Sequence, residues 1–419
     1  MVRSKLDYAC FVYDCASESA KRQLDPVHHA SLRVVTGAFR TSPSSSLLVD
    51  SHELPLACRR EMLGMRYAIK LRQFPAHPTY PYIFSRPLLA QFEITPLKCS
   101  PFCMRMQDLF ARSGIPLRRV MRVDAPTSPP WQYVRPRVDL SLTDARKADV
   151  LPIEARSRTA ELLHSYAGYR LIYTDGSKTT EGVGCAFVTE RDTRTFSLPV
   201  YTSVYTSELV AISKALSFIE VSEEVLHLIL TDSLSSLLAL RSSFSTHPLI
   251  QDILSRITSI HRAGKSVQLC WVPSHVGIAG NELADAAARR AASAPCTRRV
   301  VLPARDFYPA VRAFVQRQWQ EAWDAEPGNK LRAVKPTLES WSSSSRRQTR
   351  RGNSLPATHW PYVCYSWIPP PWRGATLLPV LWSSTHCTAR SDHVSTARTQ
   401  QKELPRSNST QRAAPPRSW

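Results

Sequence analysis

A strand-like run that ends in an aspartate is the feature that most constrains the fold of this chain. Residues 171–174 favour β-structure, Asp175 follows them, and Gly176-Ser177 forms a turn before a second strand-like run at 183–189. Two strands joined by a short turn pair in the antiparallel sense. This pattern predicts that the carboxyl group of Asp175 lies at the end of a buried strand.

The sequence after this hairpin alternates helical and strand-like patterns, which is typical of an α/β fold. The run 226–231 is apolar on both faces and follows a helical segment, so we expect a central parallel strand there. The expected fold is a mixed five-stranded sheet flanked by helices. Its other elements are strands at 194–200 and 266–271, a helix at 206–219, two helices between 233 and 263, and a final helix from about 280.

Three further acidic residues follow Asp175 at the ends of these elements. If the strand 226–231 lies beside the first strand, Asp232 ends it at the same sheet edge as Asp175. Glu208 shares a helix face with Ile212, Ala215 and Ile219, so its side chain points inward. Asp285 lies about one turn into the final helix, after a glycine-containing loop that carries His275.

Each of these residues has an ordinary structural role when it is taken alone. An aspartate often caps a turn, a glutamate near a helix N-terminus is favoured by the helix dipole, and a loop histidine is usually exposed. Together, however, four carboxylates at one sheet edge repel one another, and divalent cations between them relieve this repulsion. Ligands that are all oxygen suit Mg²⁺ or Mn²⁺ rather than zinc. Two such ions, ~4 Å apart, can clamp the attacking and leaving oxygens of a phosphoryl displacement.

Four motifs in this order closely resemble ribonuclease H type 1. They are Tyr173-Thr-Asp-Gly-Ser177, Thr206-Ser-Glu-Leu209, Thr231-Asp-Ser233 and His275-x-Gly-x-x-Gly-Asn-Glu-x-Ala-Asp285. The resemblance covers residues 166–294. It implies a ribonuclease H-like fold and an endonuclease that hydrolyses the RNA strand of RNA:DNA hybrids with two Mg²⁺ ions, for which Mn²⁺ can substitute.

The resemblance also implies a role for each matching residue. Asp175 corresponds to the ligand that bridges both metals, Glu208 and Asp232 to ligands of the metal on the leaving-group side, and Asp285 to a ligand of the metal that activates water. His275 corresponds to the histidine that assists proton transfer and product release. Glu208 also lies where the family contacts the RNA 2′-hydroxyl. The positions expected to bind the substrate are Gly176, Ser177, Ser233 and Asn281.

The charge of the chain points to a polyanionic partner, most simply nucleic acid. The formal net charge is +20, yet residues 166–294 hold 11 Lys/Arg and 12 Asp/Glu, so the basic surplus lies in the flanking segments. Between Asp232 and Trp271 the sequence lacks the basic helix by which some ribonucleases H grip their substrate. Both observations predict that the flanks contribute to substrate binding.

The composition bears on location and cofactors as well. The ten cysteines include no CxxC pair, and neither a secretory signal nor an apolar run of membrane-spanning length is recognisable. We therefore expect an intracellular protein with reduced thiols, without contact to a membrane. The sequence does not distinguish nucleus from cytoplasm, and it does not indicate an oligomeric state.

The segments around residues 166–294 divide into four further regions. Residues 1–90 read as helical. Their runs Arg3–Tyr8, Leu24–His29 and Thr36–Pro43 resemble the end of a non-LTR retrotransposon reverse transcriptase, without the paired-aspartate motif of the polymerase. Residues 91–165 read as a basic, Pro/Arg-rich connector with one short helix. A helical extension at 295–340 carries an apolar stripe that favours a docking face over a base-stacking platform. Residues 341–419, with 11 Lys/Arg and 2 Asp/Glu, read as a disordered basic tail and resemble an out-of-frame or decayed sequence.

Two classes of function follow from these features. The complete acid set favours a retrotransposon-derived nuclease. The missing polymerase motif and the unusual tail favour a non-catalytic, basic nucleic-acid-binding remnant of a decayed mobile element. A DDE-type transposase shares the strand order but lacks the loop that contains His275, so it is disfavoured.

Overall fold

The computed structural model describes residues 2–85, 100–123, 129–144, 150–242, 245–296 and 300–339. By its internal contacts the chain splits into two units, Met1–Ser342 and Ser343–Trp419. The predicted disordered tail, 341–419, lies outside the described residues. Within the described ranges, no helix has the length and apolar character that a membrane crossing requires.

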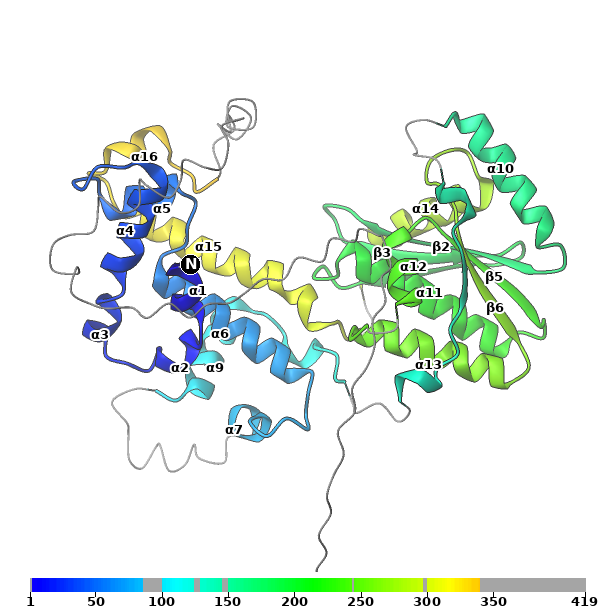
Figure 1. Ribbon diagram of the computed structural model, residues 1–419, viewed down its shortest axis with the longest axis horizontal. Coiled ribbons are helices and arrows are strands. Elements are labelled where there is room, and N and C mark those ends of the chain that lie inside the picture. Colours follow the sequence, from blue (N-terminus) through cyan, green and yellow to red (C-terminus); the bar gives the residue numbers. More distant parts are fainter. Residues whose placement is uncertain are drawn as a thin grey trace, which may run out of the picture. The chain divides into compact units, whose positions relative to one another are not determined.

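The larger unit contains a mixed sheet (Figure 1). The first three strands of the expected pattern pair antiparallel, and the strand 226–231 joins them in the parallel sense, as the sequence predicts. The strand 266–271 is parallel as well, which the sequence analysis did not specify. The strand order is β1-β6-β5-β2-β3-β4. The strands are β2 (Arg170–Lys178), β3 (Val183–Val188), β4 (Thr193–Leu198), β5 (Leu226–Thr231) and β6 (Ser266–Trp271).

The sheet has six strands, so the expectation of five is wrong by one. The additional strand, β1 (Arg137–Asp139), pairs parallel with β6 at the edge of the sheet. Three residues are too few to show a two-residue period, which is why the sequence pattern does not reveal it. Within its described residues, the segment expected to be a connector also holds the α-helices α9 (Phe102–Ser113) and α10 (Pro152–Ser165), so the expectation of one short helix is wrong.

Helices cover both faces of this sheet (Figure 1). On one face, α11 (Val204–Val221), α12 (Leu234–Arg241) and α13 (Pro248–Arg262) pack against strand residues such as Ile172 and Ile229. On the other face, α10 packs against Leu228 and Leu230, and α14 (Ala279–Ala292) packs against Ala186. The alternation of Leu228, Ile229 and Leu230 between the faces explains why this strand is apolar throughout.

The N-terminal region is helical, as expected, and it packs with the segment that follows the sheet domain. Its helices are α1 (Val2–Asp7), α2 (Cys10–Tyr13), α3 (Glu18–Arg22), α4 (Asp25–Thr36), α5 (Ser44–Asp50), α6 (Leu56–Arg72) and α7 (Tyr80–Phe84). The later segment forms the 3₁₀-helix η5 (Ala304–Phe307), α15 (Tyr308–Asp324) and α16 (Lys330–Val334).

The apolar stripe of α15 is a docking face, as its pattern predicts. Its first part, Val311, Phe314 and Val315, is buried in one cluster with Met62 and Met65 of α6. Its second part, Trp319 and Trp323, is buried in a cluster with residues of α4 and α5. The stripe therefore joins segments that lie far apart in the sequence.

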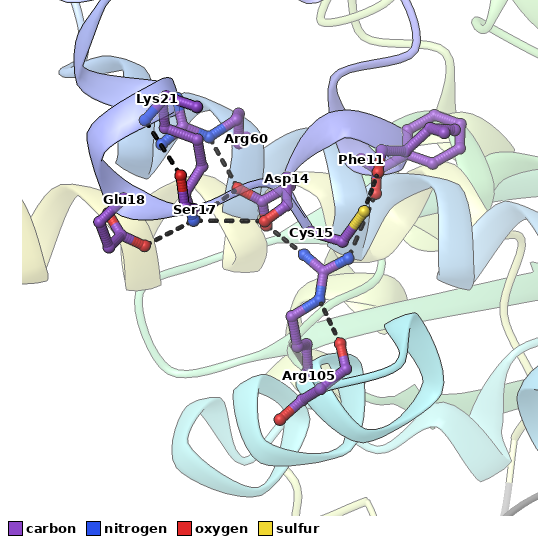
Figure 2. A network of polar contacts seen from close by, with 11 residues as sticks. Phe11, Asp14, Cys15, Ser17, Glu18, Lys21, Arg60 and Arg105 are labelled. Carbon is purple, nitrogen blue, oxygen red and sulfur yellow. Dashed lines mark hydrogen bonds and ion pairs between the residues drawn. The ribbon is translucent and has the colours of Figure 1, made fainter. Parts of the chain in front are cut away.

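A charged network fixes the N-terminal helices to α6 and α9 (Figure 2). The carboxylate of Asp14 accepts a hydrogen bond from Arg60 Nε at 2.7 Å and forms a second ion pair with Arg105. Lys21 Nζ lies 3.8 Å from the same carboxylate and 2.6 Å from Glu18. The buried guanidinium of Arg60 thus has its charge compensated, which a buried cation requires.

Candidate active site

The strand register places Asp175 beside Asp232. The expected turn at Gly176-Ser177 is wrong, because β2 continues through both residues to Lys178 and Asp175 lies within the strand. Thr174 of β2 pairs with Thr231 of β5, and one aspartate follows each of these residues. Asp175 is only 6% exposed. Gly176 follows it at a point of close approach, because a Cβ atom there would lie 2.5 Å from the backbone nitrogen of Glu208. The strand and the helix α11 can meet this closely only because the residue is glycine.

Glu208 approaches the same point from α11. The helix begins at the N-cap residue Ser203, whose hydroxyl accepts a hydrogen bond from the Thr206 N–H at 3.2 Å. Glu208 lies on the inward face, as expected, and is 7% exposed. Its Oε2 is buried and finds no hydrogen-bond partner among the described residues. Carboxylate oxygens of Asp175, Glu208 and Asp232 lie within 4.8 Å of one another.

Asp232 is positioned through both its backbone and its side chain. The indole N–H of Trp271, on the neighbouring strand β6, donates to the Asp232 carbonyl at 3.0 Å. Its carboxylate accepts a hydrogen bond from the side chain of Asn281, which lowers the pKa of Asp232 and partly opposes the larger effect of burial. Asn281 is itself buried at the start of α14. Trp271 is a contact that the sequence motifs do not mark.

Asp285 and His275 form a second group at this edge. Nδ1 of His275 lies 3.8 Å from Oδ2 of Asp285, and the histidine side chain is 61% exposed. The backbone of His275 is left-handed, with φ of 55°, as befits a tight loop before α14. Glu282 completes a set of three whose ligand atoms lie within 4.8 Å of one another, and Arg289 forms an ion pair with Asp285.

Glu282 and Arg289 were not expected at the site. Both lie on α14, where an acid in the first turn and a base in the last turn have an ordinary explanation in the helix dipole. Glu282 also accepts a hydrogen bond from the backbone N–H of Gly277 at 3.2 Å, which ties the loop to the helix. The spacing of four residues between Asp285 and Arg289 was the signal for their ion pair.

Burial and mutual repulsion raise the pKa values of the clustered acids. Burial is the largest cause for Asp175, followed by the charges of Asp232 and Asp285, and together they raise its pKa to about 7. The pKa of Glu208 is raised well above its ordinary value by burial and then by Asp175 and Asp232. Asp285 thus acts on the first group, although it shares its close contacts with His275. The structure brings all four predicted acids to one edge.

The donor chemistry of this edge fits a divalent cation. The first group offers carboxylate oxygens only, and one of them, Oε2 of Glu208, is buried without a partner. Oxygen ligands suit hard ions such as Mg²⁺, and a cation there would offset the repulsion that raises the pKa values. The clustered acids therefore form a site that a divalent metal ion complements.

The residues expected to contact substrate lie at the same edge. Ser177 is half-buried and lies on β2, two residues after Asp175. Ser233 is the N-cap residue of α12, directly after Asp232, and its hydroxyl lies 2.8 Å from that of Ser236. Gly176 and Asn281 lie against Glu208 and Asp232, as described above. These residues are therefore close to the acids in the structure as well as in the sequence.

A buried aspartate from the segment after the sheet domain supports α11. Oδ1 of Asp306, on η5, accepts hydrogen bonds from the hydroxyls of Ser203 at 2.9 Å and Thr206 at 3.0 Å. Asp306 is 6% exposed, and burial is the largest cause of its raised pKa. The helix that carries Glu208 is thus anchored by a residue roughly a hundred positions later in the sequence. No local pattern in the sequence indicates this contact.

Comparison with known proteins agrees with this geometry. A search of curated proteins finds no match to the chain. The family model of RNase H matches residues 168–293, a range that contains β2 to β6 and all four acids. Residues 168–293 are therefore an RNase H domain.

Proposed function

We propose that this domain hydrolyses the RNA strand of RNA:DNA hybrids with divalent metal ions, for which Mg²⁺ is the best candidate. The observation that carries the proposal is the convergence of Asp175, Glu208, Asp232 and Asp285 on one sheet edge within a domain of the RNase H family. Asp175, Glu208 and Asp232 would hold one ion, and Asp285 would complete the site for a second. When bound, the ions would activate water and stabilise the charge that develops on the phosphate.

The side chains of the chain itself have distinct tasks in this proposal. The raised pKa values of Asp175 and Glu208 mean that the cluster holds protons until a cation displaces them, so binding of the ion releases protons. His275 is exposed beside Asp285, where it would assist proton transfer and product release. Ser177, Ser233 and Asn281 would line the groove, and Glu208 lies where it would meet the RNA 2′-hydroxyl.

We further propose that the chain derives from a non-LTR retrotransposon. The support is the resemblance of residues 1–90 to the end of a reverse transcriptase and the composition of residues 341–419. The helical regions 1–90 and 295–340 then accompany the RNase H domain as remnants of a larger polyprotein. Translation of the gene in the other two reading frames tests this origin, because a decayed tail predicts a Cys/His zinc knuckle in one of them.

The second candidate function is nucleic-acid binding without catalysis. It is favoured by the absence of the paired-aspartate polymerase motif and by the unusual composition of residues 341–419, and the net charge of +20 is compatible with binding of a polyanion. Both functions predict binding of a hybrid, and only the first predicts its turnover.

The test uses four duplex and single-stranded substrates of one sequence. Each strand of an RNA:DNA hybrid is labelled in turn, and single-stranded RNA, double-stranded RNA and double-stranded DNA serve as controls. We expect cleavage of the RNA strand of the hybrid alone, in the presence of Mg²⁺ and not of EDTA. Hybrid binding without cleavage of either strand would favour the non-catalytic function instead.

A further inference from the structure

Arg66 is a half-buried cation without an anionic partner. It lies on α6, and its guanidinium carbon is 5.2 Å from the centroid of the Tyr308 ring. Its Nε is buried and has no hydrogen-bond acceptor, and no ion pair of Arg66 occurs within the described parts of the chain. The neighbouring Arg60 differs, because Asp14 compensates its charge. A buried donor without an acceptor is rare in folded proteins and calls for an explanation.

Two further arginines add to the positive charge around Arg66. Burial is the main reason why the pKa of Arg66 is lowered, and the charges of Arg59 and Arg312 lower it further. Arg59 is satisfied by Asp7, to which it donates at 3.0 and 2.6 Å. Arg312 is exposed one helical turn after Tyr308 and has no ion pair among the described residues. The free protein thus holds like charges together, which is unfavourable unless an anion joins them.

A third arginine, Arg305, links Tyr308 to the segment that contacts the helix carrying Glu208. Arg305 is exposed, and its charge acts on Tyr308 and on His247, the N-cap residue of α13. The next residue, Asp306, is buried and hydrogen-bonded to Ser203 and Thr206 at the start of α11. This anchor fixes the backbone of Arg305 against the RNase H domain. We call Arg66, Arg305 and Arg312, arranged around Tyr308, the arginine row.

We propose that the arginine row binds the phosphate backbone of the nucleic acid that is cut at the acid cluster. The inference rests on the proposed function, and it names where the chain grips its substrate. A guanidinium presents a rigid fork of donors that matches phosphate oxygens, and it desolvates more readily than an ammonium group. Tyr308 adds an aromatic surface among the cations, a combination typical of nucleic-acid contacts.

A nucleic acid fits this row better than another phosphorylated ligand. The RNase H domain is nearly neutral by residue count, so the surplus of positive charge that attracts a polyanion lies outside residues 166–294. The row supplies that charge from α6, η5 and α15, and the Asp306 anchor connects it to the catalytic helix. A single phosphate group needs only one pair of arginines. A nucleic-acid backbone carries successive phosphates, so each arginine of the row can contact a different one.

The test measures hybrid binding by the full chain as a function of salt. The variant Arg66→Gln/Arg312→Gln is placed in an Asp175→Asn background, so that cleavage does not interfere, and a labelled hybrid is titrated by fluorescence anisotropy. We expect the Kd to rise by tenfold or more at moderate salt. The slope of log K against log salt should become shallower by about 0.9 for each lost phosphate contact, as on duplex DNA.

The matched control removes two charges elsewhere. Arg22 and Arg40 are exposed and make no ion pair among the described residues, so Arg22→Gln/Arg40→Gln has the same net charge as the test variant. Its Kd and salt slope should stay near those of the parent. Equal effects of the two variants would show that total charge governs binding, and the row would then have no special role.

Stability separates a ligand-binding role from a structural one. Because Arg66 and Arg312 repel each other in the free protein, their replacement should leave the Tm unchanged or raise it. A lower Tm together with unaltered hybrid binding would overturn the proposal and mark Arg66 as a packing residue. The exposed single variant Arg312→Gln gives the same readout if the double variant does not fold.

Two probes distinguish the ligand class and keep the two proposals apart. Inorganic phosphate and a phosphoserine peptide are titrated against parent and variant. If the variant loses affinity for the peptide and not for the hybrid, the row is not a nucleic-acid site. Since binding is measured without cleavage, absence of nuclease activity would refute the proposed function alone, whereas unchanged hybrid binding would refute the row alone.

Discussion

The acidic residues of the site illustrate how a fold can force like charges together. Asp175 is 6% exposed and lies beside Asp232 because the register of β2 and β5 leaves no other arrangement. In the metal-free protein this placement destabilises the ionised carboxylates, since water and counter-charges are largely excluded. A site of this kind gives up stability in the free protein for affinity toward cations.

The pH dependence of stability follows from this arrangement. The pKa of Asp175 is raised from 3.8 to about 7, so the folded, metal-free protein binds a proton that the unfolded chain has released between these values. Its free energy of unfolding therefore falls as pH rises from about 4 to about 7, by at most about 4 kcal/mol from this group. The variant Asp175→Asn lacks the titrating carboxyl group, so its free energy of unfolding does not fall in this way. Its stability relative to the parent should grow over that pH range in EDTA, as measured by urea unfolding.

Saturating Mg²⁺ provides the control for this prediction. A cation that offsets the repulsion should stabilise the parent above pH 7 and leave Asp175→Asn less affected. A stability difference that is independent of pH in EDTA would contradict the assignment of the raised pKa to Asp175.

At the residue scale, the sequence identified the four acids as candidates, but it did not indicate the residues that hold them in place. Asp175, Glu208, Asp232 and Asp285 were identifiable because each lies in a sequence motif, although Asp175 lies within β2 rather than at its end. The buried anchor Asp306 could not be found, because it contacts Ser203 and Thr206 through tertiary structure alone. Roles at helix ends are also ambiguous, since Glu282 has a local explanation as an N-terminal acid as well as a place beside His275.

Among the elements, α11 depends on close packing against β2. A Cβ atom at Gly176 would lie 2.5 Å from both the Glu208 nitrogen and the Ser207 hydroxyl. Gly176→Ala should therefore move the first turn of α11, lower stability by about 1–3 kcal/mol and reduce cleavage. Gly328→Ala is the matched control, because a Cβ atom there meets nothing within 4 Å. Thermal melts and initial rates of hybrid cleavage test both variants. If Gly176→Ala matches Gly328→Ala in stability and rate, the close approach of β2 and α11 is not required.

The anchor of α11 gives a second prediction at this scale. Asp306→Ala removes the acceptor of the half-buried Ser203 hydroxyl and of the buried Thr206 hydroxyl, so it should cost about 1–3 kcal/mol and slow cleavage through displacement of Glu208. Asp306→Asn keeps one oxygen as an acceptor and should restore most of both properties. Asp324→Ala, at a half-exposed position 3.6 Å from Arg332, should cost less than about 1 kcal/mol. Failure of asparagine to restore activity would mean that the charge of Asp306 matters, rather than its hydrogen bonds.

The order of the strands and helices in the RNase H domain was predictable from the sequence, whereas the strand β1 at the edge of the sheet was not. The strands 226–231 and 266–271 were expected with the bounds that the structure shows, because long apolar runs between polar turns have few other interpretations. The strand β1 is too short to leave a period, and it depends on β6 for its pairing. Its presence shows that the RNase H domain draws on residues before the family match begins at 168.

At the scale of the whole molecule, the segments that carry the net positive charge are separate in the sequence from the acids proposed to cleave RNA. The acid cluster lies in a nearly neutral domain, and the basic surplus lies in the segments around it. Since residues 343–419 hold 11 Lys/Arg and 2 Asp/Glu, truncation after Ser342 removes a net charge of +9. We expect a higher KM for hybrid and a shallower salt dependence, with similar turnover at saturating substrate.

Kinetics at several salt concentrations test this expectation. A truncated chain that matches the full chain in KM and in salt slope would show that the tail takes no part in binding. Binding would then rest on the arginine row and on the groove of the RNase H domain.

Cleavage of RNA at the acid cluster is the central proposal for this protein. The measurement that tests it compares initial cleavage rate and Kd for one RNA-labelled hybrid, in Mg²⁺, between the parent and Asp175→Asn. Asp252→Asn serves as the control within the same domain, because Asp252 is exposed and pairs only with its surface neighbours Arg256 and Ser213. We predict that Asp175→Asn binds the hybrid as tightly as the parent or more tightly, since repulsion falls, and cleaves it no faster than background. Turnover by Asp175→Asn at the rate of the parent would contradict the account.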